Sequence, residues 1–66
     1  MSGDAPLERL AHDLRTPLTI IEGFVDLLLR QGDDLGEEER AAHLERIRAA
    51  AREIAARVDE LDVPAT

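Results

Sequence analysis

Apolar residues recur at alternating steps of three and four through most of this chain, and this spacing restricts the fold to helices. A first series runs through Leu7, Leu10, Leu14, Pro17, Ile21, Phe24 and Leu28, and it is widened by Ala11, Leu18 and Val25. Residues spaced in this way share one face of an α-helix, whereas a strand requires a period of two. A second series follows a stricter heptad pattern through Leu44, Ile47, Ala51, Ile54, Val58 and Leu61. Such a pattern is typical of helices that pack at a shallow angle.

The segment QGDDLGEEE separates the two apolar series and carries the signals of a turn. Gly32 suits the end of one helix and Gly36 the start of the next, and the glutamates at 37–39 complement the positive end of the second helix. We therefore predict helices over about residues 6–31 and 37–62, with the turn at residues 32–36. Pro6 fits the first turn of a helix, and Pro64 fits a stop after the second helix.

The short chain determines how these helices can be stabilised. A single domain of 66 residues is too small to bury a large core alone, and two antiparallel helices cover only one stripe on each other. The apolar face of the first helix is also broader than one partner helix can cover. We therefore expect an all-α fold, an antiparallel two-helix hairpin that dimerises into a four-helix bundle.

Composition excludes several classes of function. The absence of cysteine excludes disulfides and thiolate metal sites, and the formal net charge of −7 argues against a nucleic-acid partner. No apolar run approaches the roughly 20 residues that cross a bilayer, and no signal-peptide pattern is present. We expect no membrane contact by this segment.

The stretch HDLRTP, from His12 to Pro17, combines an exposed imidazole with a helix-breaking residue. At 100° per residue, His12 falls roughly 170° from the centre of the apolar stripe. A lone histidine on a polar face is usually only solvated. However, a proline inside a helix costs about 3 kcal/mol and frees the carbonyl of Asp13, directly beside His12. Backbone strain next to a titratable ring indicates a working site.

The stretch HDLRTPLTIIEGFVDLLL closely resembles the H-box of sensor histidine kinases. That motif begins with a histidine, an acidic residue and one residue of any type. A basic residue, threonine or asparagine, proline and leucine then follow in order. The start of the second helix, LGEEERAAHLERI, is also similar to the second helix of their dimerisation and histidine-phosphotransfer domain. The resemblance covers about residues 7–61.

This resemblance implies a role for each residue of the motif. His12 matches the phosphoacceptor that takes the γ-phosphoryl group of ATP and passes it to an aspartate of a response regulator. Asp13 matches the general base or orienter of the imidazole, and Thr16 matches the residue that positions water when the regulator is dephosphorylated. Arg15 would support the phosphate or a neighbouring carboxylate, and Pro17 would form a structural hinge. For Asp13 and Arg15 simple solvation remains open, and for Thr16 so does a bond back to a helix carbonyl.

The exposed stripe that contains His12 continues toward the turn through Thr19, Gly23, Asp26 and Arg30. Glycine inside a helix costs about 1 kcal/mol relative to alanine. We therefore predict that a regulator helix packs closely at Gly23, with Thr19 and Asp26 beside it.

The remaining polar residues have structural interpretations. His43 flanks the seam of the second helix and is read as a bundle-edge residue, and Glu53 and Arg57 form an i, i+4 pair that supports the helix. No HExxH-like ligand spacing accompanies either histidine, so we expect no metal site.

The chain has no glycine-rich phosphate loop, so no ATP-binding domain is expected in it. ATP and magnesium would bind a separate catalytic domain, and the chain itself would hold no cofactor. The expected partners are a second copy, that catalytic domain and a response-regulator receiver domain, in the cytoplasm, whether or not a longer parent protein is anchored in a membrane. The alternatives are a free-standing dimeric phosphorelay protein and an inert dimerisation module. Whether the chain alone counts as an enzyme, and which signal and regulator it serves, stay open.

Overall fold

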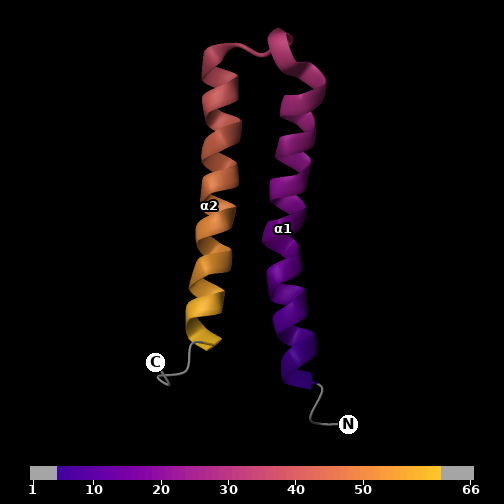
Figure 1. The fold of residues 1–66 in the computed structure, drawn as a ribbon, viewed down its shortest axis with the longest axis vertical. Coiled ribbons are helices and arrows are strands. Elements are labelled where there is room, and N and C mark those ends of the chain that lie inside the picture. The colour runs from indigo at the N-terminus through magenta and orange to yellow at the C-terminus, as the bar shows by residue number, and fades with distance from the viewer. Residues whose placement is uncertain (1–4, 62–66) are drawn as a thin grey trace.

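The computed structural model describes residues 5–61, which form two long helices joined by a short turn (Figure 1). Helix α1 spans Ala5–Gln31, a 3-10 helix η2 spans Gly32–Asp34, and helix α2 spans Glu37–Leu61. The start of α1 lies one residue before the predicted one. The predicted end of the second helix at residue 62 and the stop at Pro64 lie outside the described residues.

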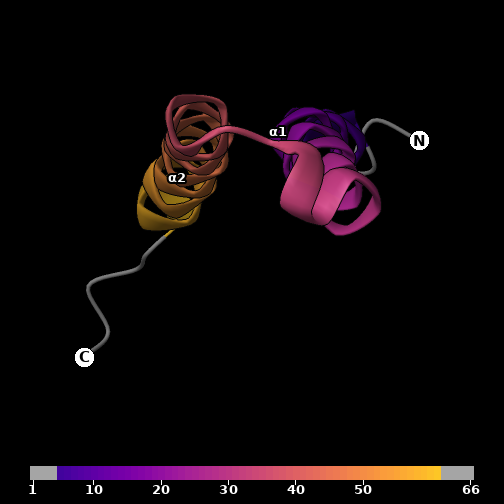
Figure 2. The same cartoon turned by 90° about the horizontal axis from the view of Figure 1, so that it is seen from above.

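The two helices lie side by side and run antiparallel in a single layer (Figures 1 and 2). The molecule measures 48 × 28 × 13 Å, so it is about one helix thick in its shortest dimension. The prediction of an all-α antiparallel hairpin is therefore confirmed. A single layer leaves one whole side of each helix without a partner, and few side chains are buried as a result.

Helix α1 packs on α2 through the predicted apolar stripe. Leu10, Leu14, Ile21, Phe24 and Leu28 are half-buried, and the side chain of Pro17 is less than 2% exposed. The proline therefore lies in the contact between the helices, where its ring adds apolar surface. Helix α1 continues through Pro17 without interruption.

The row of α2 that faces α1 coincides only in part with the heptad seam, because Ile47 and Ile54 belong to both and the other seam residues do not face α1. The inward row is His43, Ile47, Ala50, Ile54 and Arg57, and Ala50 is only 5% exposed. The seam residues Leu44, Val58 and Leu61 remain about half exposed. The rings of Phe24 and His43 are in contact, so these two residues lie level with each other. Seven residues further along in opposite directions, Ala50 lies level with Pro17. A small side chain is needed there because the proline ring fills the space between the helices.

The turn is held by backbone geometry and by two side chains. Gly32 has φ +41°, a left-handed conformation that glycine adopts readily at a helix end. The backbone N–H of Gly36 donates to Oε1 of Glu39 at 3.3 Å, which is half of a capping box. Arg40 donates from Nη2 to the carbonyl oxygen of Gly32 at 3.0 Å, so α2 also caps the end of α1.

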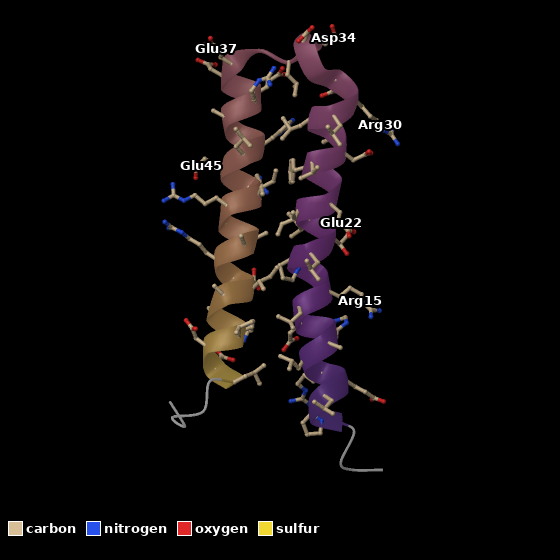
Figure 3. The ribbon with its side chains drawn as sticks, in the orientation of Figure 1. Arg15, Glu22, Arg30, Asp34, Glu37 and Glu45 are labelled. Carbon is tan, nitrogen blue, oxygen red and sulfur yellow. The ribbon has the colours of Figure 1, made fainter. Side chains whose placement is uncertain are left out.

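Charged side chains cover the outer sides of the hairpin. Figure 3 shows Arg15, Glu22 and Arg30 pointing away from α2, and Glu45 pointing away from α1. The Glu53–Arg57 pair predicted from the sequence is wrong, because Arg57 pairs with Glu60 at 3.5 Å instead. An arginine can reach a carboxylate three or four residues away in either direction, and Arg57 extends toward the helix end. Between residues 5 and 61, neither helix has an apolar stretch long enough to span a membrane.

Candidate functional site

His12 is the eighth residue of α1, and its side chain is exposed on the side of the helix that faces away from α2. Its position follows from helix geometry, since Leu10 and Leu14 on either side of it turn toward α2. The ring is free to meet a large partner from solvent. An exposed imidazole of this kind can react with a group that another protein presents.

Pro17 follows His12 by five residues and is the most deeply buried large side chain near it. Because proline has no N–H, the carbonyl of Asp13 lacks its usual donor four residues later. This leaves a free backbone acceptor within one residue of the exposed imidazole. The burial of the ring explains how α1 keeps the proline, because packing against α2 offsets the lost hydrogen bond.

Thr16 lies one turn after His12 and is exposed. Its hydroxyl donates to the backbone carbonyl oxygen of His12 at 3.5 Å. This is the bond back to the helix that the sequence left open as an alternative for this residue. The length of the contact makes it weak, so the hydroxyl remains available to water or to a phosphoryl oxygen.

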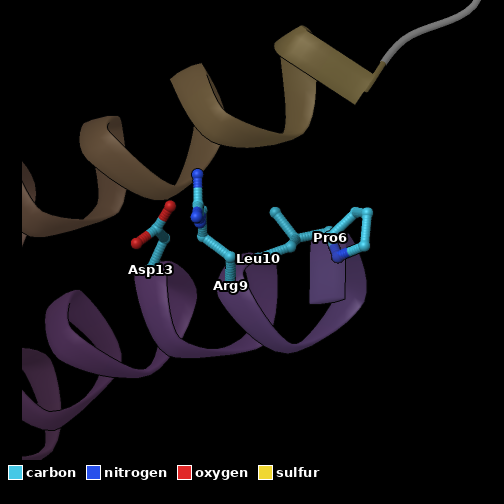
Figure 4. Close-up of a pocket in the computed structure, with 4 residues that line it drawn as sticks. All are labelled: Pro6, Arg9, Leu10 and Asp13. Atoms are coloured by element: carbon cyan, nitrogen blue, oxygen red, sulfur yellow. The ribbon is translucent and has the colours of Figure 1, made fainter. Parts of the chain in front are cut away.

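Asp13 does not share the open side of His12. Its side chain is half-buried, and it lines a shallow pocket of about 330 Å³ together with Pro6, Arg9 and Leu10. Figure 4 shows Asp13 and Arg9 both extending toward α2 from successive turns of α1. Among residues 5–61, no hydrogen bond joins the Asp13 carboxylate to His12. Adjacent residues on a helix point about 100° apart, which accounts for the separation.

The other predicted residues lie on the open side of α1. Arg15 is exposed and points outward, as Figure 3 shows, and Thr19 is exposed one turn further on. Asp26 is exposed and pairs with Arg30 at 3.0 Å. A methyl group built on Gly23 would meet nothing within 4 Å, so no part of the described chain requires a glycine at this position.

Two features near this stripe were not predicted from the sequence. Ile20 and Leu27 are 39% and 37% exposed, although both are large and apolar. Phe24 lies between them in the sequence, and its ring contacts that of His43 with 5.1 Å between the centroids. The guanidinium carbon of Arg46 lies over the Phe24 ring, 5.9 Å from its centroid. His43 is thus half-buried inside the hairpin and is not the edge residue that the sequence indicated. In the sequence, the exposed apolar pair was indicated only by the seven-residue spacing of Ile20 and Leu27, which lie outside the main apolar stripe.

The site has one exposed nucleophile, a nearby hydroxyl and a free backbone carbonyl. Across residues 5–61, no group of three or more histidine, aspartate or glutamate side chains is arranged to hold a metal ion. The exposed imidazole can accept a phosphoryl group from a donor that another protein presents. The arrangement therefore suits a substrate domain for group transfer.

Comparison of the sequence with known protein families gave a match that agrees with a role in group transfer. Residues 7–63 match the family described as HisKA, the His Kinase A (phospho-acceptor) domain. The match covers the turn, α2 and all but the first two residues of α1, and it includes His12, Asp13, Arg15, Thr16 and Pro17. Comparison with curated proteins and with solved structures gave no significant match.

Proposed function

This chain belongs to the His Kinase A (phospho-acceptor) domain family, and we propose that it is the phosphoacceptor and dimerisation domain of a two-component sensor histidine kinase. The observation that carries this proposal is the exposed imidazole of His12 on a helix whose opposite side is packed. The chain supplies the acceptor, and a separate catalytic domain supplies ATP and magnesium. The proposed reaction therefore takes place in the cytoplasm, where ATP is available.

In the first step, a ring nitrogen of His12 attacks the γ-phosphorus of ATP. A P–N bond forms as the bond between this phosphorus and the β,γ-bridging oxygen breaks, and ADP leaves. The second ring nitrogen then gives up its proton to a base. In the second step, a regulator aspartate attacks the phosphorus, the P–N bond breaks, and the ring regains a proton.

Asp13 is the proposed acceptor of that proton, or the group that orients the ring. Its carboxylate must rotate out of the pocket beside Arg9 to reach His12, and the free carbonyl beside Pro17 gives this turn of α1 fewer backbone restraints. Arg15 projects from the same side of α1 and would stabilise phosphoryl oxygens. Pro17 acts as the structural hinge of the site.

Thr16 is the proposed positioner of water when the phosphorylated regulator is dephosphorylated. Its hydroxyl lies one turn from His12 and makes only a long contact with the backbone. A water held there would lie next to the point where the regulator aspartate meets His12. We assign this phosphatase activity to the hydroxyl and not to the imidazole.

A second copy of the chain is the proposed occupant of one flank of the hairpin. This heptad flank contains Leu7, Leu18 and Val25 from α1 and Leu44 and Val58 from α2, all between 37% and 65% exposed. Each group lies about 70° from the inward row of its own helix, in the same rotational sense. In an antiparallel pair, that places both groups on one side of the hairpin. Two copies joined through this flank would form a four-helix bundle.

The regulator is the proposed occupant of the open side of α1 below His12. Thr19, Gly23 and Asp26 lie along this side, and no described residue covers Gly23. Ile20 and Leu27 border the same side and give it an apolar margin. A helix of a partner can approach closely where exposed apolar residues lie beside a glycine that no other side chain covers.

Labelling of His12 tests the proposal. The chain is incubated with ATP, magnesium and a separately purified catalytic domain of a histidine kinase, and acid-labile, base-stable phosphate is measured. We expect label with the catalytic domain present and none with ATP alone. His12→Gln should abolish the label, whereas His43→Gln, at the other histidine of the chain, should retain it. Label on His12→Gln would reject the proposal.

Profiling of receiver domains tests the second step and the alternatives. Phosphorylated chain is mixed with individual purified receiver domains from the source organism, and transfer to each is timed. One or a few receivers should accept the phosphoryl group far faster than the others. An inert dimerisation module would neither accept the group nor pass it on.

A further inference from the structure

Arg46 holds an unusual position on α2. Its guanidinium carbon lies 5.9 Å from the centroid of the Phe24 ring on α1, within the range of a cation–π interaction. The side chain nevertheless remains exposed. Phe24 therefore fixes where the positive charge lies without removing it from solvent.

The charge of Arg46 is not neutralised by the described part of the chain. The ion pairs within residues 5–61 involve Arg30, Arg48 and Arg57, and none involves Arg46. The helix positions within side-chain reach, three and four residues away, hold Ala42, His43, Ala49 and Ala50. The adjacent Glu45 points away from α1 and pairs with Arg48 at 3.8 Å. On the face of α2 that Arg46 occupies, the next carboxylates are Glu39 and Glu53, seven residues away and about 10 Å along the axis.

The surroundings of Arg46 are apolar and lie close to the proposed regulator surface. Ile20, Phe24 and Leu27 are spaced by four and three residues, so they form one continuous row on α1. Arg46 covers the middle member of this row, and the outer two are 39% and 37% exposed. Ile20 lies eight residues after His12, about 12 Å along the helix axis.

We propose that Arg46 is a specificity-determining residue, which pairs with a carboxylate on the regulator surface that covers Ile20 and Leu27. This inference rests on the proposed transfer from His12 to a regulator. The chain carries a formal charge of −7, so its net charge repels an acidic partner, and a cation without an ion pair attracts one locally. Arg46 combines such a charge with the exposed apolar row of Ile20 and Leu27. A regulator with a carboxylate in register with Arg46 would be accepted, and one with a lysine there would be rejected. A second copy of this equally acidic chain fits the exposed leucine and valine side chains of the heptad flank better.

Arg52 provides a matched control. It is exposed, has no carboxylate three or four residues away, and takes part in no ion pair within residues 5–61. It lies about 180° from the inward row of α2, away from Phe24. Arg52→Glu therefore changes the net charge of the chain by the same amount as Arg46→Glu, but away from the proposed contact.

The test uses the receiver domain that accepts the phosphoryl group fastest from the unmodified chain. Phosphorylated Arg46→Glu should transfer to it with kcat/KM lowered about tenfold, mainly through KM, whereas Arg52→Glu should change it less than about twofold. Arg46→Lys should retain most of the rate, because it keeps the charge. Labelling of His12 by the catalytic domain and dimer formation should be unchanged in all three variants.

A charge reversal on the receiver separates pairing from simple packing. Its surface carboxylates are changed to lysine one at a time, and one of these variants should transfer faster with Arg46→Glu than with the unmodified chain. Equal losses for Arg46→Glu and Arg52→Glu would overturn the proposal, as would the lack of any compensating receiver variant. Loss of His12 labelling itself would instead reject the proposed function, so the two failures are distinguishable.

Discussion

The hydroxyl of Thr16 donates to the backbone carbonyl of His12 across one turn of α1, with 3.5 Å between the two oxygens. A contact of this length contributes little to the stability of the helix. It does keep the hydroxyl on the same open side as the imidazole. The two side chains can therefore be separated experimentally, because removal of one should leave the fold and the other in place.

Thr16→Val should remove the hydroxyl while keeping the shape of the side chain. We expect unchanged thermal unfolding and unchanged labelling of His12, because neither depends on this weak bond. Dephosphorylation of the phosphorylated regulator should slow by about tenfold or more, because its attacking water loses an orienting group. Release of inorganic phosphate measures this rate. Thr16→Ser is the control and should retain activity, and equal rates for serine and valine would contradict the role.

Leu18 and Ile20 are two residues apart on α1, yet they lie on opposite sides of its inward row. Both are exposed, at 47% and 39%. Leu18→Asp should place a charge in the proposed dimer contact and shift the chain from dimer to monomer at micromolar concentration. Ile20→Asp should leave the dimer intact and slow transfer to the receiver domain. Sedimentation and timed phosphotransfer measure the two effects.

The opposite pattern would reverse the assignment of the two flanks. If Ile20→Asp dissociated the dimer and Leu18→Asp did not, the second copy would occupy the side that we assign to the regulator. Helical content measured by circular dichroism provides the control, since both variants should remain helical as dimers or at high concentration.

Gly23 is expected to lower the free energy of unfolding of the chain while leaving room for the receiver domain to approach α1. Because nothing lies within 4 Å of a methyl group built there, Gly23→Ala should raise the free energy of unfolding by up to about 1 kcal/mol. A bulky residue, as in Gly23→Gln, should keep the dimer but slow transfer to the receiver by hindering its approach. Urea unfolding and phosphotransfer assays measure the two quantities. Unchanged transfer in Gly23→Gln would reject close packing of a partner at this position.

The hairpin was predictable from the sequence because one stripe on α1 dominates its periodicity. Apart from Asp13, the half-buried positions from Leu10 to Leu28 all belong to the first apolar series. The exposure of His12 followed from the same stripe, since its position on the helix is fixed once the inward side is known.

The inward row of α2 was not predictable in the same way. Its heptad seam contains the larger residues Leu44 and Val58, but the structure turns Ala50 toward α1. Periodicity alone cannot distinguish a row that packs within the hairpin from one that is left for another partner. The contact of Arg46 with Phe24 depends on this rotation of α2, so it too required the structure.

Gly32 should be the least replaceable glycine of the turn. Its φ of +41° is unfavourable for a residue with a Cβ, although a methyl group would meet nothing within 4 Å. Gly32→Ala should therefore lower the free energy of unfolding by about 1 kcal/mol through backbone strain alone. Gly32→Asn should cost less, because asparagine tolerates this conformation better. Equal losses in thermal unfolding for alanine and asparagine would argue against a strained backbone as the cause.

Ala50 and Ala49 offer a direct test of how closely the helices approach. Ala50 is 5% exposed and lies level with the buried Pro17, whereas Ala49 is exposed. Ala50→Leu adds volume where the helices meet and should lower the free energy of unfolding by about 1–3 kcal/mol. Ala49→Leu, with the same chemical change one residue earlier, should alter stability by less than about 0.5 kcal/mol. Urea unfolding at a fixed concentration of chain measures both values. Equal effects would mean that α2 is rotated from the orientation described and that the heptad seam, with Ala51, faces α1 after all.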